Sequence, residues 1–230
     1  MTPRVCAILP ALNEADALPV ALRDRPPGMP VLVVDNGSSD GTAEVALALG
    51  AQVVTEPRRG FGAACYAGAR AAPEGAVLVF MDADGSLGWD DAERVVAPVV
   101  DGRAELSLGW RRRDLRAPGA MSWHVSAANA LLGWLCGRGA GMRLHDVGPL
   151  RAIRRETLLG LGLADRTYGW PLEMVLRAGR SGLRITEVPV AYHPRVGTSK
   201  VTGKPWPTVK AVSRMLVVLA QHARGPRAAR

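Results

Sequence analysis

The chain has 230 residues, and its 29 lysines and arginines outnumber 21 aspartates and glutamates to give a net charge of +8. With 48% hydrophobic and 22% charged residues it has the composition of a globular protein, and no apolar run approaches the roughly 18 to 20 residues that span a bilayer. Three distant cysteines without a CxxC pair argue against a disulfide framework and indicate a reducing, cytoplasmic location. The chain starts directly with a strand-like segment, so we expect no signal peptide. Basic and aromatic residues are not interleaved as in proteins that stack bases, so nucleic acid is not an expected partner.

The first half of the chain alternates short apolar runs with helical stretches, which predicts βαβ units and a mainly parallel sheet. Asn13 and Asp40 are suitable caps for the helices that follow the first two strands. The predicted strands are residues 5–9, 31–34, 52–55, 76–81 and 105–109, and the predicted helices begin at Glu14, after Asp40, within 56–72 and at Trp89.

The second half of the chain is less regular. It predicts a helix over residues 122–136, a loop and strand over 142–153, a short helix over 171–178 and a strand over 185–191. A last helix is expected over residues 207–224, with Val209, Val212, Leu216 and Leu219 on one side.

The apolar run over residues 76–81 is the clearest strand signal in the chain, and the main candidate site follows it directly. It predicts a strand buried on both faces, and it ends in Asp82 and Asp84, followed by Gly85. Open parallel sheets bind ligands beyond the carboxyl ends of their strands. Two close carboxylates repel each other without a cation, and hard oxygen ligands suit Mg²⁺ or Mn²⁺ that also binds substrate phosphates. An ordinary turn explains the same residues equally well at this stage.

Other polar residues follow the strands, each with a structural alternative. Asp35 ends the second predicted strand, where its carboxylate can bind a base or a ribose or form a turn. Glu14 follows the first strand, and a carboxylate favoured by the helix dipole is the simpler interpretation. The glycines of Gly60-Phe61-Gly62 permit backbone approach to a phosphate, but helix–sheet packing explains them equally well.

Two further groups are candidates for phosphate binding and proton transfer. Arg195, Ser199 and Lys200 place two cations and a hydroxyl in one loop, which suits a phosphate, although a solvated basic loop is the alternative. Asp146 and Glu173 are the remaining candidates for acid–base chemistry, although most such carboxylates are surface residues.

Taken in order, these motifs resemble those of family 2 glycosyltransferases of GT-A fold. The closest likeness is to the polyprenyl-phosphate (dolichyl-phosphate) mannose and glucose synthases, and it covers about residues 4 to 204. The motifs that carry it are Pro10-Ala11-Leu12-Asn13-Glu14, residues 33–42, Met81-Asp82-Ala83-Asp84-Gly85, and residues 187–200.

The resemblance implies a Rossmann-like α/β fold and a metal-dependent, inverting transfer of a sugar from a UDP- or GDP-sugar. Asp84, with Asp82, would hold Mg²⁺ or Mn²⁺, and Asp146 would stand beside the reacting sugar. Arg195, Ser199 and Lys200 would receive the acceptor's phosphate or the donor diphosphate. The residues expected at the nucleotide-sugar are Pro10, Leu12, Glu14, Asp35, Arg59, Asp82 and Asp84.

The resemblance also implies a domain division and an acceptor. Residues 1–204 would form the catalytic domain, with a nucleotide-binding half (1–110) and an acceptor half (111–204), followed by a helix and basic tail (205–230). The expected acceptor is a polyprenyl phosphate, and the last helix, if it does not simply pack on the core, would lie on an anionic membrane surface.

The chain departs from the synthases at several places, residues 142–153 and 170–173 among them, so the donor sugar and the acceptor stay open. Asn36 stands where they often have a second Asp, and Gly85-Ser86 replaces Leu-Ser, so a third metal ligand is open. A hydroxyl acceptor would require a base, for which Asp146 and Glu173 are the candidates. A sugar-phosphate nucleotidyltransferase, a non-catalytic sugar-nucleotide module and a nucleic-acid-binding protein are the alternatives from other classes.

Overall fold

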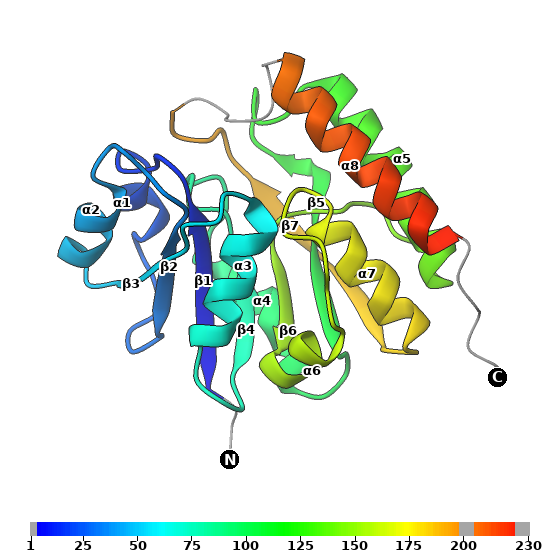
Figure 1. Cartoon of the computed structure of the whole chain (residues 1–230), viewed down its shortest axis with the longest axis horizontal. Coiled ribbons are helices and arrows are strands. Elements are labelled where there is room, and N and C mark those ends of the chain that lie inside the picture. The colour runs from blue at the N-terminus through cyan, green and yellow to red at the C-terminus, as the bar shows by residue number, and fades with distance from the viewer. Residues whose placement is uncertain (1–3, 198–204, 224–230) are drawn as a thin grey trace.

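The computed structural model describes residues 4–197 and 205–223, and its core is a seven-stranded sheet flanked by helices (Figure 1). The strand order is β3-β2-β1-β4-β6-β5-β7, and β6 alone runs antiparallel to its neighbours in this sheet. The prediction of a mainly parallel sheet is therefore confirmed. The strands are β1 (Val5–Ala11), β2 (Val31–Asp35), β3 (Gln52–Thr55), β4 (Val77–Phe80), β5 (Leu106–Arg116), β6 (Arg151–Arg154) and β7 (Ile185–Tyr192).

Helices cover both faces of the sheet, and β4 shows why its sequence is continuously apolar. Leu78 and Phe80 pack into the core on the side of α3, α5 and α7, whereas Val77 and Val79 pack on the side of α1, α2 and α4. The helices are α1 (Leu18–Ala21), α2 (Thr42–Ala48), α3 (Phe61–Ala71), α4 (Trp89–Val100), α5 (Trp123–Ala140), α6 (Arg155–Gly160), α7 (Trp170–Arg180) and α8 (Pro205–Ala223). Within the described ranges, no helix has both the length and the hydropathy needed to cross a bilayer.

The first strand and the first helix differ from their predicted bounds. β1 continues through Pro10, which pairs with Val34. Pro10 faces the β4 side, where pairing has already ended at Ile8, so its missing N–H breaks no ladder bond. Asn13 does not cap a helix, because it has a left-handed backbone (φ 55°) and its side chain accepts the Ser39 N–H instead. The helix therefore starts later and is a single turn.

The second half differs from the prediction in strand length and in the last helix. β5 runs past residue 110, and α6 was not predicted. In α8, Met215, Val218 and Leu219 face the core, whereas Leu216 is 54% exposed, so the predicted apolar side is rotated. Val209 and Val212 are outside the described side chains. The division into domain halves stays a prediction.

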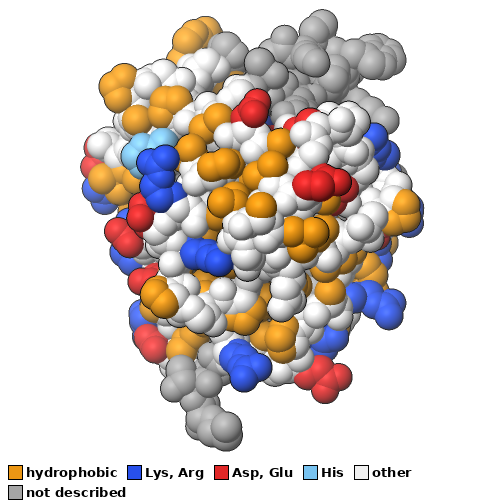
Figure 2. Space-filling view, turned by 90° about the vertical axis from the view of Figure 1, so that its left-hand side faces the viewer, with side chains coloured by type: hydrophobic (Ala, Val, Ile, Leu, Met, Phe, Trp, Pro, Cys, Tyr) orange, Lys and Arg blue, Asp and Glu red, His pale blue; other side chains and the backbone are white. Residues whose placement is uncertain are grey.

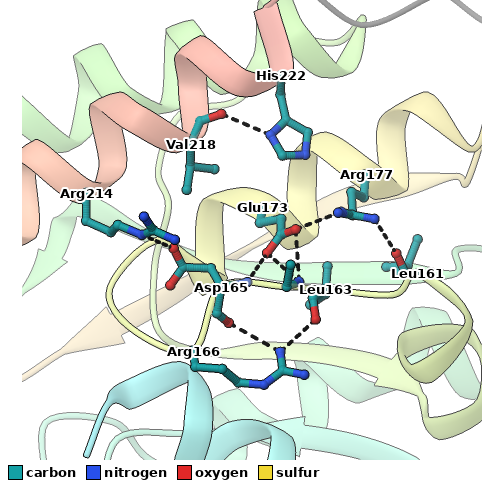
Figure 3. Close-up of polar contacts among 10 residues, drawn as sticks. Leu161, Leu163, Asp165, Arg166, Glu173, Arg177, Arg214, Val218 and His222 are labelled. Carbon is teal, nitrogen blue, oxygen red and sulfur yellow. Dashed lines mark hydrogen bonds and ion pairs between the residues drawn. The ribbon is translucent and has the colours of Figure 1, made fainter.

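The loop between α6 and α7 is fastened by buried carboxylates (Figure 3). Glu173 accepts the backbone N–H groups of Ala164 and Asp165 and the Nε–H of Arg177. Asp165 in turn forms an ion pair with Arg214 of α8. These contacts hold α8 against α7 on one side of the molecule.

Candidate active site

The predicted polar residues meet where β1, β2 and β4 end. These three strands are adjacent and parallel. From β1 the chain adds β2 and β3 on one side of the sheet, and it then crosses to add β4 on the other side of β1. Glu14 follows β1, Asp35 is the last residue of β2, and Asp82 and Asp84 follow β4. Such a switch point is where open α/β sheets bind ligands.

The loops after β1 and β2 form one hydrogen-bonded unit. Asn13 N–H donates to Ser38 Oγ at 2.9 Å, and Glu14 N–H donates to Thr42 Oγ1 at 2.9 Å. Asp35 Oδ1 accepts the Ser38 N–H at 2.9 Å. The turn interpretation of Asp35 is therefore correct for one of its oxygens, and the second oxygen is not needed for the turn. Pro10 and Leu12 lie at the start of the same unit.

Asn36 explains one of the departures from the synthase pattern. Its amide donates to the carbonyls of Glu56 and Arg58, both at 2.8 Å, and its Oδ1 accepts the Gly60 N–H at 2.7 Å. An aspartate could not donate these two bonds, so this connection requires the amide. The connection holds the loop that carries Arg59, whose Nε lies 3.2 Å from the point where a Cβ on Gly37 would be. Arg59 therefore lies beside the loop after Asp35.

The N-terminus of α3 is not a free phosphate cradle. The N–H groups of Gly62 and Ala63 donate to the carbonyls of Thr167 and Arg166 at 3.2 and 2.8 Å. A Cβ on Gly60 would lie within van der Waals overlap of the Arg166 carbonyl oxygen. Close packing against the α6–α7 loop therefore explains these glycines.

Asp84 is buried and oriented by its own turn. Its Oδ1 accepts the Ser86 N–H at 3.0 Å and the Ser86 hydroxyl at 2.6 Å. Its Oδ2 lies 3.4 Å from Nη1 of Arg195, whose Nη2 donates to Glu14 Oε1 at 3.1 Å. The backbone N–H of Val196 donates to the Asp84 carbonyl at 2.9 Å, which fixes the loop after β7 in this place. Arg195 thus bridges the ends of β1 and β4.

Asp82 lies beside Asp84 in a setting that disfavours its charge. Burial and, to a smaller extent, the Asp84 charge raise the pKa of Asp82 to about 7, against the opposing effect of Arg111 and Arg195. Carboxylate oxygens are the ligands that Mg²⁺ and Mn²⁺ prefer, and a divalent cation would offset the repulsion between these two side chains. Among the described residues, no group of three or more His, Cys, Asp or Glu side chains is placed to hold a metal ion. A cation held by these two side chains would need further oxygen ligands from a bound group.

Arg111 and Asp146 form a buried, two-point ion pair that sequence reasoning missed. Arg111 donates from Nε and Nη2 to the two Asp146 oxygens at 2.8 Å each, and its backbone N–H donates at 3.1 Å. Burial alone would lower the pKa of Arg111, but its bonds to Asp146 raise it above the usual value. Both oxygens of Asp146 are thus engaged, which weighs against a free general base. Its predicted place beside the reacting sugar stays a prediction.

Arg151 is a second buried arginine that was not predicted. It donates to the carbonyls of Gly148 and Pro171, and its guanidinium lies 5.8 Å from the centre of the Trp170 ring. Burial lowers its pKa to about 10, although the charge of Asp82 acts against that shift. The only sequence signal was a cation inside the apolar segment Leu150–Ile153.

The structure does not bring every predicted residue to this edge. Glu173 lies at the start of α7, and its hydrogen bonds to the α6–α7 loop give it a structural explanation. Its predicted role as an acid or base is untested. Ser199 and Lys200 lie outside the described residues.

We expect Arg195 and a divalent cation to compete for Asp84, and this competition can be measured. Arg195→Ala should bind Mn²⁺ several-fold more tightly than the wild type when no donor is present, because a guanidinium 3.4 Å from Asp84 opposes a second cation there. Isothermal titration calorimetry of the donor-free protein measures this. Arg184→Ala, which removes an exposed arginine paired with Glu105, is the control. Equal or weaker Mn²⁺ binding by Arg195→Ala would contradict the competition.

Comparison with known proteins agrees with this geometry. A family model for Glycosyl transferase family 2 matches residues 6–158. A glycosyltransferase of Mycobacterium tuberculosis is 44% identical over 202 residues, which cover 86% of this chain and 90% of that protein. The undecaprenyl-phosphate mannosyltransferase of Micrococcus luteus is 34% identical over 220 residues, with 87% and 88% covered.

A solved structure extends the likeness to the fold. Glucosyl-3-phosphoglycerate synthase from Mycobacterium tuberculosis, in complex with Mn²⁺, UDP and glucosyl-3-phosphoglycerate, superposes with a TM-score of 0.74 at 24% identity. The match covers 98% of this chain and 82% of that one. The fold is therefore that of the GT-A glycosyltransferases. The chain belongs to glycosyl transferase family 2 and is a glycosyltransferase.

Proposed function

We propose that this enzyme transfers a hexose, with inversion, from a UDP- or GDP-sugar to the phosphate of a polyprenyl lipid. The single observation that supports the proposed donor site is the pair formed by buried Asp84, beside Arg195, and half-buried Asp82 at the switch point of the sheet. Two carboxylates and one arginine at this place suit a diphosphate bound together with a cation.

The nucleoside end of the donor fits the loops after β1 and β2. Glu14 and the second oxygen of Asp35 would accept hydrogen bonds from base N–H and ribose hydroxyl groups, and Pro10 and Leu12, at the end of β1, would lie beside the nucleoside. Arg59, exposed beside Gly37, is placed to approach the nucleotide phosphates.

Asp84, with Asp82, would hold Mg²⁺ or Mn²⁺. When bound, the cation supplies positive charge that stabilises the leaving nucleoside diphosphate. Arg195 acts on the same oxygens from the protein side. Its Nε is buried and has no hydrogen-bond partner in the described part of the chain, and a phosphate oxygen would satisfy that donor.

Two arguments support a lipid phosphate as the acceptor: it needs no general base, and a similar protein is named for such an acceptor. A lipid phosphate is already an anion near neutral pH, so it can attack the anomeric carbon without a general base. Asp146 and Glu173, the two candidate bases, are both engaged by arginines. The Micrococcus luteus relative is named for transfer to undecaprenyl phosphate. Work on such a lipid would place the enzyme at the cytoplasmic face of a membrane. With Arg195 at the donor diphosphate, Ser199 and Lys200 remain the residues predicted to bind the acceptor phosphate.

Donor binding is tested by thermal shift with UDP-, GDP- and dTDP-sugars, each with and without Mn²⁺. At one hundred times its dissociation constant, a ligand stabilises the folded state by about 2.7 kcal/mol, which corresponds to a rise in Tm of about 5 to 10 °C. We expect this rise for one nucleotide class and only with the cation. No rise with any donor, or equal rises without Mn²⁺, would contradict the proposed donor site.

A further inference from the structure

Large apolar side chains are exposed on both α5 and α8. Trp123, Leu131 and Trp134 of α5 are 82%, 57% and 53% exposed, and Leu216 and Val217 of α8 are 54% and 42% exposed. The two helices contact each other and lie side by side at one end of the sheet (Figure 1). At 100° per residue, the three α5 side chains fall within one narrow stripe. We call these five residues the α5–α8 face.

The two segments that carry this face contain no carboxylate. Residues 115–145 and 188–230 together hold 11 lysines and arginines and no aspartate or glutamate, whereas the remainder holds 18 against 21. Arg138, in the α5 stripe, lies with its guanidinium 5.2 Å from the centre of the Trp134 ring. The whole excess of positive charge therefore falls within these two segments of the sequence, and Arg138 and Arg143 line one open cavity together with Trp134.

The opposite end of the molecule lacks this separation. Figure 2 shows the side that carries α1 and α2, where acidic, basic and apolar side chains are interspersed. Leu47 of α2 is 59% exposed there, and Val20 of α1 is 37% exposed. Scattered apolar residues of this kind are normal on a protein surface.

We propose that the α5–α8 face docks on a bilayer surface that contains anionic lipids. Tryptophans with flanking arginines are the side chains that settle at the headgroup level, and the basic charge is complementary to anionic headgroups. A second copy of the chain is disfavoured as the occupant, because it would bring the same positive charge against the first. This inference names the partner surface for the proposed lipid acceptor and in that respect rests on the proposed function.

The α5–α8 face is joined to the candidate active site. A Cβ on Gly133 of α5 would lie only 3.0 Å from the His145 carbonyl carbon and 3.1 Å from Asp146 N, so the helix packs directly on this backbone. Arg116 donates to the Arg111 carbonyl and to Ser126 Oγ of α5, both at 2.7 Å. An open cavity of about 510 Å³ at the end of α5 is lined by residues that include Trp134, Arg138 and Arg143. Docking would therefore bring the Arg111–Asp146 ion pair, and the part of the candidate active site around it, close to the lipid headgroups.

Vesicle sedimentation of the full chain tests the docking. Wild-type protein should pellet with phosphatidylcholine vesicles that contain phosphatidylglycerol, and less with phosphatidylcholine alone or at high salt. Leu131→Ser with Trp134→Ser should weaken the partition coefficient by about tenfold or more, because two apolar side chains leave the interface. Leu216→Ser with Val217→Ser tests α8 in the same way, and Leu47→Ser is the control. Circular dichroism verifies that each variant is folded.

The outcomes separate the docking from the reaction. Transfer to a short, water-soluble isoprenyl phosphate should be unchanged in the α5–α8 variants, because they leave the sheet edge intact. Vesicle binding without any transfer would support the docking and refute the reaction. Failure of the wild type to bind anionic vesicles, equal loss in Leu47→Ser, or self-association that the variants abolish would each overturn the docking.

Discussion

Asp84→Asn should transfer sugar about a thousandfold more slowly than the wild type, a loss of roughly 4 kcal/mol in transition-state stabilisation. The amide keeps the size of the carboxylate, and its oxygen can still accept the bonds from Ser86. What it removes is the negative charge where the cation is expected, so the fold should persist while chemistry and Mn²⁺ binding are lost. Single-turnover rates and calorimetric Mn²⁺ titration in the presence of nucleoside diphosphate measure the two effects.

The control for Asp84 is another aspartate close in the sequence. Asp90 is exposed in the first turn of α4, so Asp90→Asn removes the same charge without touching the edge of the sheet. Its rate should equal that of the wild type. A fully active Asp84→Asn enzyme, or one with an undiminished requirement for the metal, would refute the proposed donor site.

Breaking the Arg111–Asp146 pair should lower the free energy of unfolding by about 3 to 5 kcal/mol. The side chains of both partners are nearly inaccessible, at 9% and 2%, so Asp146→Leu leaves a guanidinium buried without its counter-charge. Arg111→Met combined with Asp146→Leu should be less destabilised than either single variant, because it removes both charges together. Urea denaturation measures all three.

The control pair lies on the same strand. Arg112 and Asp114 form an exposed ion pair, and Asp114→Asn should leave the unfolding midpoint unchanged. Transfer by the shape-conserving Asp146→Asn, assayed below its unfolding transition, then separates the acceptor classes. If Asp146→Asn binds the donor and keeps its turnover, the acceptor is a phosphate. Retained turnover in Glu173→Gln would support the same conclusion. An inactive but stable Asp146→Asn would instead indicate a general base and a hydroxyl acceptor.

Local patterns were enough to predict the parallel sheet and the edge where the site lies. Strands such as β4 are buried on both faces and read as apolar runs, and a carboxylate just beyond such a run must lie at the sheet edge. The helix predicted to begin at Trp89 does begin there, as α4. Thus the information for this half of the fold is contained within windows of a few residues.

Contacts between distant segments could not be predicted in this way. The antiparallel β6 enters between β4 and β5, and no local signal distinguishes its direction. Arg195 contacts Asp84 and Glu14 across more than a hundred residues, and the Arg111–Asp146 pair joins residues 35 apart. Arg214 of α8 forms an ion pair with Asp165 of the α6–α7 loop, a contact that the sequence of the helix alone does not reveal. Pairings of this kind are decided by tertiary packing.

The position of Arg195 has a consequence for the order in which ligands arrive. The Arg195 guanidinium lies beside Asp84 and Glu14 and partly neutralises them, so it should oppose the binding of a free cation there. If the donor diphosphate binds Arg195 as proposed, the arginine would move toward the diphosphate and Asp84 would become available to the cation. Sugar nucleotide and ion should therefore bind synergistically, and the factor by which each tightens the other must be equal. Without a bound sugar nucleotide, the protein would then bind almost no divalent cation at cellular concentrations.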